Sequence, residues 1–188
     1  VGDKCCKSEC DVDDDNVQAG REFAESLKGR VYRRIGMSAG PLSMPAGVDR
    51  LEGFRQALDA AGLESGPVED GNFTADGGAA AMERILARPE RPDALFIASD
   101  LMARGALAIL GRAGIRVPED LAIVGFDDSP VATSVTPHLT TMRQPSFTQG
   151  ERMAEVLLDL LADRDPPRVT MLNTELVVRD SVLAAAPR

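Results

Sequence analysis

Aromatic residues, cysteine and histidine are scarce in this chain of 188 residues, which has no Trp, one Tyr, six Phe, three Cys and one His. The cysteines are Cys5, Cys6 and Cys10, all at the start of the chain. A structural zinc site takes about four Cys or His ligands at characteristic spacings. We therefore expect reduced thiols, no metal and no cofactor. The odd number of cysteines also argues against a complete disulfide framework.

Long apolar runs and an excess of positive charge are also missing. No run approaches the roughly 18 apolar residues that indicate a membrane helix, and no signal sequence opens the chain. The formal net charge is -9, whereas a surface that binds nucleic acid is normally basic. If the protein acts on DNA, we expect the contact to come from sequence outside this chain. Val1 begins without an initiator Met, so we expect a fragment of a longer protein.

The common catalytic fingerprints are absent as well. Neither a G-x-S-x-G elbow, a P-loop nor a G-x-G-x-x-G loop occurs. Asp127 and Asp128 resemble a hydrolytic pair, but neighbours in sequence rarely face one substrate from opposite sides. The sequence therefore does not favour an enzyme.

Strands and helices alternate along the chain with tight loops between them. This alternation predicts an α/β fold with a doubly wound parallel sheet and right-handed crossovers. Asn16, Thr74 and Ser99 are candidate helix caps, and the first 15 residues resist assignment. The expected helices cover 17–27, 48–61, 75–86, 100–113 and 145–161, and the expected strands cover 33–39, 67–73, 93–98, 121–126, 169–172 and 175–178.

Two polar residues follow neighbouring buried strands. Ser99 comes after the apolar run 93–98, and Asp127 comes after the apolar run 121–126. In an open parallel sheet, small ligands bind outside the carboxyl ends of the strands, beside helix N-termini. This layout favours a sensor pocket over a catalytic one.

Several segments keep a characteristic order along the chain: IGMSAGP, DRLEGFRQAL, DGNFT, PDALFIASDLMARGAL, GIRVPEDLAIVGFDD, TPHLTTMRQP and LNTELVVRDSV. Together they resemble the effector-binding core of the LacI/GalR family of bacterial transcription regulators, over about residues 12–182. The resemblance implies the type I fold of periplasmic binding proteins. Two lobes are then joined by crossover strands, and the ligand lies in the cleft between them.

The resemblance also implies a division of the chain. Residues 15–142, completed by 174–188, correspond to the C-terminal lobe. Residues 1–14 and 143–173 correspond to remnants of the N-terminal lobe, and the DNA-binding headpiece is absent. The segment RVYRRI at 30–35 departs from the LGHRRI of many relatives, and the cysteine-rich start matches no family pattern.

Two charged residues carry the predicted ligand site. Arg50 falls at the family's ligand-binding arginine, and a guanidinium offers a fork of donors to hydroxyls or carboxylates. The alternative interpretation is that Arg50 is a surface arginine paired with Asp49 or Glu52. Asp127 falls at the family's ligand-binding aspartate, where a carboxylate accepts hydrogen bonds from vicinal hydroxyls. The alternative interpretation is that Asp127 is an ordinary aspartate in a loop or at a helix cap.

Further residues complete the predicted site. Ser99 replaces the Asn of many sugar-binding relatives, with a plain helix cap as the alternative. Phe73 ends the expected strand where the family stacks an aromatic ring on its ligand, with core packing as the alternative. We expect Met44 and Ala46 to line the cleft, and Ser146 to contact the ligand from the other lobe.

The resemblance implies a ligand-sensing domain of a cytoplasmic regulator, in which a small metabolite such as a sugar changes operator affinity. It also implies a homodimer, with helix 100–113 and loop 129–136 near the interface. The alternative is a periplasmic sugar-binding protein of a transport system. Helix 145–161 has an apolar face, which we expect to pack on a neighbouring chain or on further segments.

Overall fold

A six-stranded sheet forms the centre of the fold in the computed structural model, which describes residues 10–27 and 32–183. The five strands β3, β2, β4, β5 and β6 are parallel, and β8 at the edge is antiparallel to β6. In sheet order the strands are β3 (Glu64–Asp70), β2 (Arg34–Ala39), β4 (Ala94–Ile97), β5 (Ala122–Asp127), β6 (Thr140–Arg143) and β8 (Glu175–Val177).

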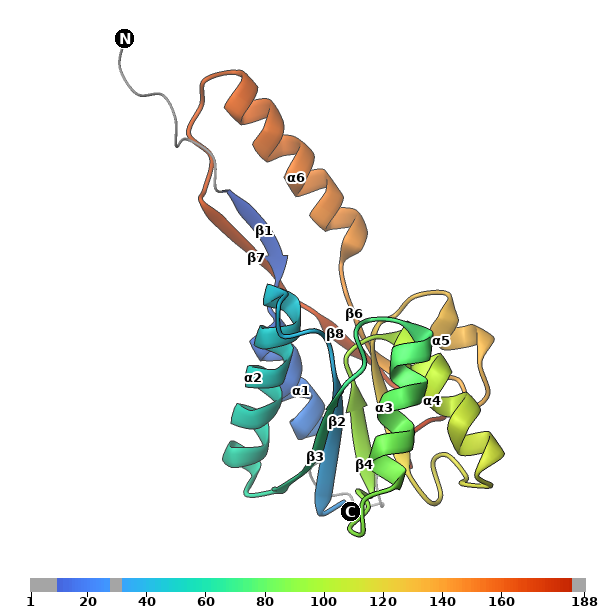
Figure 1. The fold of residues 1–188 in the computed structure, drawn as a ribbon. Coiled ribbons are helices and arrows are strands. Elements are labelled where there is room, and N and C mark those ends of the chain that lie inside the picture. Colours follow the sequence, from blue (N-terminus) through green and yellow to red (C-terminus); the bar gives the residue numbers. More distant parts are fainter. Residues whose placement is uncertain (1–9, 28–31, 184–188) are drawn as a thin grey trace.

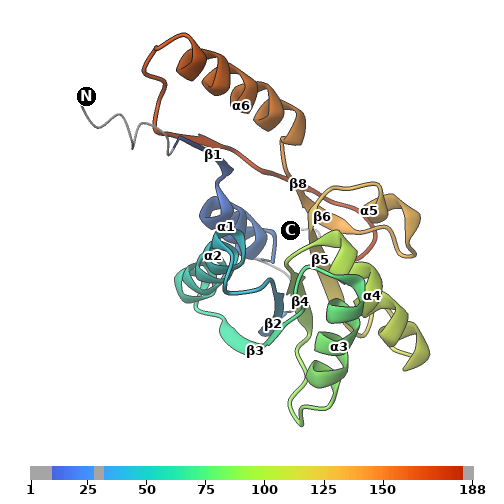
Figure 2. The same cartoon turned by 45° about the horizontal axis from the view of Figure 1, so that its top comes forward.

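Helices cover both faces of this sheet, as Figures 1 and 2 show. Helices α1 (Asn16–Leu27) and α2 (Pro45–Ala61) pack together on one face, while α3 (Ala75–Leu86) and α4 (Asp100–Arg112) pack on the other. The faces alternate because the chain leaves β2 in one direction along the sheet and leaves β3 and β4 in the other. The predicted doubly wound α/β fold is confirmed.

Phenylalanines fill the centre of the core. The ring of Phe96 on β4 stacks on Phe23 with centroids 4.8 Å apart, and it lies 6.2 Å from Phe54 and 6.3 Å from Phe126. All four rings are fully buried, so they join α1 and α2 to the sheet. Aromatic pairs at these separations stabilise a core beyond the area that they bury.

A second part of the fold, called the arm here, extends away from the six-stranded sheet and its covering helices. It consists of the parallel pair β1 (Asp11–Asp14) and β7 (Val169–Leu172), with α6 (Ser146–Leu161) beside it (Figure 1). None of the α6 residues is buried among the described residues, and Phe147 is 81% exposed. The other exposed large apolar side chains of the arm are Met153, Leu157, Leu158, Leu161, Val169 and Met171.

The structure corrects several sequence-based boundaries. Strand β3 begins and ends three residues earlier than predicted, at Glu64 and Asp70, because the carboxylate of Asp70 accepts a hydrogen bond from the Asn72 amide. That side-chain turn ends the strand, so Phe73 lies in a turn and does not end the strand. Helix α2 begins at Pro45, three residues before the predicted start, since proline is favoured in a first helical turn.

Three short elements were not predicted: β1, α5 (Val131–Ser134) and β6. Each is four residues long, and β1 consists mainly of aspartate, which has low strand propensity. Asp15, and not Asn16, caps α1, because its carboxylate accepts a hydrogen bond from the Gln18 amide at 2.8 Å. Cys5, Cys6 and residues 30–31 lie outside the described residues, whereas Cys10 is a half-buried free thiol.

Glycines set the distance between the paired helices. A Cβ atom added to Gly53 of α2 would lie 2.8 Å from the Cα of Val17 in α1. A Cβ added to Gly105 of α4 would lie 1.8 Å from the carbonyl oxygen of Ala75 in α3. Any side chain at these positions would force the helices apart, whereas Gly111 of α4 has no atom near its Cβ position.

We therefore expect opposite effects from two alanine substitutions in the same helix. Gly105→Ala should lower the free energy of unfolding by about 1–3 kcal/mol or more, because it overpacks the α3–α4 contact. Gly111→Ala should raise it by up to about 1 kcal/mol, because alanine restricts the unfolded chain and favours helix. Urea unfolding of both variants and the wild type checks this. Equal effects of the two substitutions would contradict the close helix crossing.

Candidate functional site

A cavity of about 330 Å³ opens beyond the carboxyl ends of β4 and β5. Its volume lies at the lower end of the range for small-molecule sites, roughly 300–1,000 Å³. The direction of the crossovers reverses between the adjacent strands β2 and β4, and the helices that follow these strands bring Arg50 and Leu101 to the cavity. Such a switch point is the usual ligand site of an open α/β sheet. The lining residues are Ala46, Arg50, Phe73, Ser99, Leu101, Asp127 and Gln144.

Arg50 of α2 supplies a buried cation to this cavity. Its Nε donates a hydrogen bond to Oδ1 of Asn16 at 2.8 Å, and Nη1 donates to the carbonyl of Ala98 at 2.7 Å. The guanidinium carbon lies 3.6 Å from the ring centroid of Phe126. Nη1 also lies 3.9 Å from Oδ1 of Asp127. Since Arg50 is only 6% exposed, it is not the surface arginine of the alternative interpretation.

The charge of Arg50 is balanced by carboxylates on two sides. Burial lowers the pKa of its guanidinium, and the negative charges of Asp127, Asp14 and Asp13 oppose that change. An arginine keeps its proton even in a partly buried site. The cavity therefore holds a fixed positive charge beside Asp127.

Strand β5 begins and ends one residue later than predicted, so Asp127 is its last residue and does not lie in the loop after it. The φ of 114° at Asp127 is unusual for a residue other than glycine, and Asp128 follows with a φ of 53°. Such backbone strain is concentrated at functional sites. The side chain is 33% exposed, and burial raises its pKa to about 7 against the opposing charge of Arg50.

Asp128 performs a different task from its neighbour. Its carboxylate accepts hydrogen bonds from Nε of Arg143 at 2.6 Å and from Nη2 of Arg179 at 2.5 Å. Burial opposes ionisation, but hydrogen bonds from the two arginines hold the pKa of Asp128 below its ordinary value. Asp128 therefore joins β6 to the chain after β8, and Asp127 alone faces the cavity.

Ser99 and Phe73 both line the cavity. Ser99 caps α4, because its hydroxyl accepts a hydrogen bond from the Met102 amide at 3.2 Å. Phe73 has a φ of 52° and lies in the turn after β3, with its ring against Gly40. A Cβ atom added to Gly40 would lie 2.2 Å from Cζ of Phe73, so the ring occupies the space of a missing side chain.

The remaining expected residues divide into two groups. Ala46 lines the cavity, whereas Met44 is an exposed residue before α2 and Ser146 is an exposed residue at the start of α6. Neither Met44 nor Ser146 is among the lining residues. Sequence reasoning missed Leu101 and Gln144, although Leu101 follows the cap residue of α4 and Gln144 directly follows β6.

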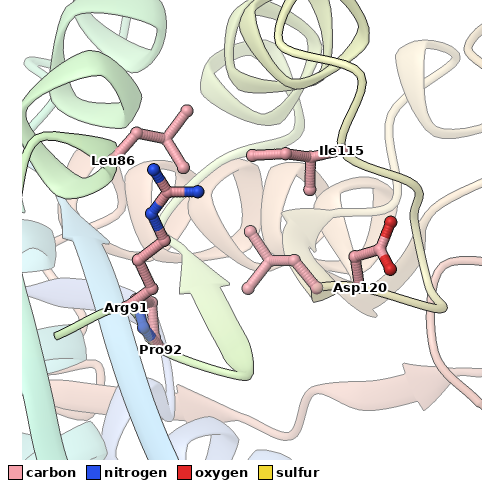
Figure 3. Close-up of a pocket in the computed structure, with 6 residues that line it drawn as sticks. Leu86, Arg91, Pro92, Ile115 and Asp120 are labelled. Carbon is pink, nitrogen blue, oxygen red and sulfur yellow. The ribbon is translucent and has the colours of Figure 1, made fainter.

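A smaller hollow of about 100 Å³ lies at the opposite end of the sheet (Figure 3). It is formed before the first residues of β4 and β5, between the ends of α3 and α4. Its volume is below the range of ordinary ligand sites. The lining residues are Leu86, Arg91, Pro92, Ile115, Asp120 and Leu121.

Within residues 10–27 and 32–183, no group of three or more His, Cys, Asp and Glu side chains is arranged to hold a metal ion. In the same described part, none of the helices combines the length and apolar character needed to cross a membrane.

The fold and the cavity define a class: an α/β domain with an open cavity at the switch point of its sheet, the place where sheets of this kind bind small molecules. The family of periplasmic binding protein-like domains matches residues 24–182. The chain belongs to this family, as an effector-binding core of the LacI/GalR group of regulators.

Named relatives agree with this assignment. The transcriptional regulator CelR of Thermobifida fusca is 46% identical over 173 residues, covering 90% of this chain and 51% of the relative. The transcriptional repressor PurR of Escherichia coli is 36% identical over 174 residues, covering 91% of this chain and 51% of the relative. The chain thus spans about half the length of these relatives, which are named as regulators of transcription and not as enzymes.

Solved structures give the same result. A CelR–cellobiose complex superimposes with a TM-score of 0.87 at 44% identity, covering 93% of this chain and 54% of that chain. A lac repressor dimer bound to operator and an anti-inducer has a TM-score of 0.87 at 28% identity, covering 92% of this chain and 60% of that chain.

The raised pKa of Asp127 predicts how stability changes with pH. The pKa is about 7 in the folded protein and about 4 in an unfolded chain, so the folded state binds more protons between these values. The contribution of Asp127 to stability therefore falls as pH rises from about 4 to about 7. Asp127→Asn should make the fall in stability between pH 5 and pH 8 smaller than in the wild type, as measured by urea unfolding at both pH values.

The matched control is Glu52→Gln, on the exposed side of α2. It should keep the pH dependence of the wild type. An unchanged pH dependence in Asp127→Asn would show that Asp127 is not the group that titrates.

Proposed function

We propose that this chain is the ligand-sensing domain of a LacI-type DNA-binding regulator, in which a small metabolite bound at the cavity changes operator affinity. One observation carries the proposal. Arg50 and Asp127 come from distant parts of the chain, yet their charged groups lie 3.9 Å apart on an open cavity at the carboxyl end of the sheet. A ligand in the cavity would contact both groups from the open side.

The chemistry of the cavity fits a sugar. The guanidinium of Arg50 is a donor and the carboxylate of Asp127 is an acceptor, and adjacent hydroxyls on a pyranose ring need both. Phe73 offers an aromatic surface for a sugar ring, while Ser99 and Gln144 add uncharged polar groups. Since a relative with 44% identity is named as a CelR–cellobiose complex, cellobiose is the first ligand to test.

The division into two lobes is part of the proposal. Residues 15–142 and 174–188 form one lobe, and residues 1–14 and 143–173 belong to a second lobe. The exposed apolar face of α6 supports this division, because soluble proteins rarely leave such a face uncovered. In a two-lobed protein, ligand binding between the lobes favours one relative orientation over another, a coupling typically of about 1–3 kcal/mol.

The proposed partners follow from charge and from the relatives. A chain of net charge -9 does not itself neutralise phosphates, so we assign operator binding to sequence outside these residues. The relatives CelR and PurR are named as HTH-type regulators, and one lac repressor structure is named as a dimer bound to operator. We therefore propose a cytoplasmic homodimer, with α4 and residues 129–136 near its interface.

The competing functions have less support. A periplasmic sugar-binding protein would share the fold, but the named relatives are regulators and not transport proteins. A hydrolytic enzyme with a pair of carboxylates would need a second catalytic carboxylate beside Asp127. The neighbouring Asp128 does not fit this role, because it is paired with Arg143 and Arg179.

Titration calorimetry against cellobiose, maltose and adenosine tests the ligand class. We expect cellobiose to bind, and Arg50→Ala or Asp127→Ala to weaken binding about 10- to 100-fold, the usual cost of a charged hydrogen bond. Arg55→Ala, on the exposed side of the same helix, should change affinity by less than about twofold. Binding that survives both substitutions would remove the cavity as the ligand site.

Light scattering of the full-length protein tests the dimer. We expect a dimer, and Ala108→Arg on the exposed face of α4 should give a monomer, because a long charged side chain would disrupt an apolar helix contact. A wild-type monomer at high micromolar concentration, or a variant that remains dimeric, would contradict the assigned interface.

A further inference from the structure

We propose that Asn16 is a positioning residue of the ligand site, which directs Arg50 at the cavity and ties it to strand β1. Ligand binding at Arg50 is thereby transmitted to the arm. The inference rests on the proposed function, because it requires a ligand that contacts Arg50.

The amide of Asn16 makes two hydrogen bonds in opposite directions. Its oxygen accepts from Nε of Arg50 at 2.8 Å, and its nitrogen donates to the carbonyl of Asp14 at 3.1 Å. Asp14 is the last residue of β1, where the strand pairs with Leu172 of β7. Asn16 is only 3% exposed, so both bonds form away from solvent. One side chain therefore connects the arm to the cation of the cavity.

Asn16 is free for this role because another residue caps the helix. Asp15 accepts the hydrogen bond from the Gln18 amide that an asparagine cap would otherwise accept. The side chain of Asn16 does not stabilise the start of α1 by capping. Its side-chain amide instead bonds Arg50 and the last residue of β1. Neither bond is needed to begin the helix.

The close crossing of α1 and α2 fixes the distance between the two residues. At Gly53 the backbone of α2 approaches Val17, the residue after Asn16, with no space for a side chain. Arg50 lies one turn before Gly53 in the same helix. A movement of the Arg50 side chain is therefore passed to Asn16, because the helices themselves cannot separate without losing this contact.

The charges around Asp14 add a second connection between the arm and Arg50. The side chain of Asp14 is buried, and its Oδ1 has no hydrogen-bond partner. Burial raises the pKa of Asp14, and the charge of Asp13 raises it further, whereas the charge of Arg50 lowers it. The end of β1 is thus sensitive to the position of the Arg50 guanidinium. A ligand that holds the guanidinium in place therefore steadies the end of β1.

Two substitutions separate the two hydrogen bonds. Asn16→Ala removes both of them. Asn16→Asp keeps an acceptor for Nε of Arg50 but removes the donor to the Asp14 carbonyl. Gln18→Ala is the control, because this residue lies in the first turn of the same helix and its side chain bonds Glu22, outside this network. Thermal unfolding of each variant verifies that it is folded.

The first measurement needs no ligand. In nuclear magnetic resonance, the Nε–H proton of Arg50, assigned by its loss in Arg50→Lys, should exchange slowly in the wild type and in Asn16→Asp. It should exchange about tenfold faster in Asn16→Ala, as expected for the loss of one buried hydrogen bond. Equal exchange in the wild type and Asn16→Ala would overturn the positioning role.

The second measurement uses cellobiose as the ligand. Calorimetry should show affinity about tenfold weaker in Asn16→Ala, and close to the wild type in Asn16→Asp. Hydrogen exchange of residues 11–14 should slow on ligand binding in the wild type and in Gln18→Ala, and much less in Asn16→Asp, because only the charge of Asp14 then connects β1 to Arg50. If Asn16 had only a structural role, Asn16→Asp would change the affinity and the response of β1 together. The proposal predicts that it changes the response of β1 and leaves the affinity close to the wild type.

The outcomes for the two proposals are distinct. Cellobiose binding with wild-type affinity in Asn16→Ala, or a response of β1 in Asn16→Asp as large as in the wild type, overturns the inference and leaves the proposed function standing. Failure of the wild type to bind cellobiose or any other sugar overturns the proposed function, and with it the coupling to ligand. The positioning of Arg50 is then decided by the exchange of its Nε–H proton alone.

Discussion

The buried guanidinium of Arg50 links the layers of this fold. Removing a charge from water is costly unless hydrogen bonds and opposite charges replace the solvent. Arg50 obtains these partners from three parts of the fold: Asn16 at the start of α1, the Ala98 carbonyl after β4, and Asp127 at the end of β5. The ring of Phe126 covers one face of the cation. The sheet, both helices of one layer and the cavity must therefore form together.

Two adjacent aspartates have different surroundings in this fold. Asp128 is ionised and joined to two arginines, so it holds the edge of the sheet together. Asp127 has a strained backbone, a raised pKa and a single distant cation, so its hydrogen-bonding capacity is not used up within the protein. A ligand with hydroxyl groups would supply what Asp127 lacks. Of the two carboxylates, only that of Asp127 lines the cavity.

Much of the six-stranded sheet and its covering helices could be predicted from local patterns. The apolar runs that became β4 and β5 are buried on both faces, and Ser99 caps α4 as its position before a helical pattern indicates. The family resemblance directed attention to Arg50, Asp127, Phe73, Ser99 and Ala46, and the fold brings all of them to one cavity. These positions are readable because each follows directly from a strand end or a helix start.

Other features depend on pairing that sequence patterns do not record. Strand β1 is a run of aspartates, and it exists because β7, far along the chain, provides its hydrogen bonds. The bounds of β3 are set by its pairing with β2 and not by the strand propensities of its own residues. Gln144 and Leu101 became lining residues only through the tertiary arrangement. Asn16 was misread as a cap, because an adjacent Asp15 offers the same chemistry and the competition between them is decided by three-dimensional contacts.

The contact between Phe73 and Gly40 has a consequence for how relatives of this protein could diverge. The aromatic ring fills the volume that any side chain at position 40 would need, and Gly40 itself does not line the cavity. Replacement of that glycine would displace the ring and reshape the aromatic wall while every lining residue stayed the same. Ligand preference in such proteins can therefore evolve through a backbone position, so a comparison of pocket residues alone would overlook the change.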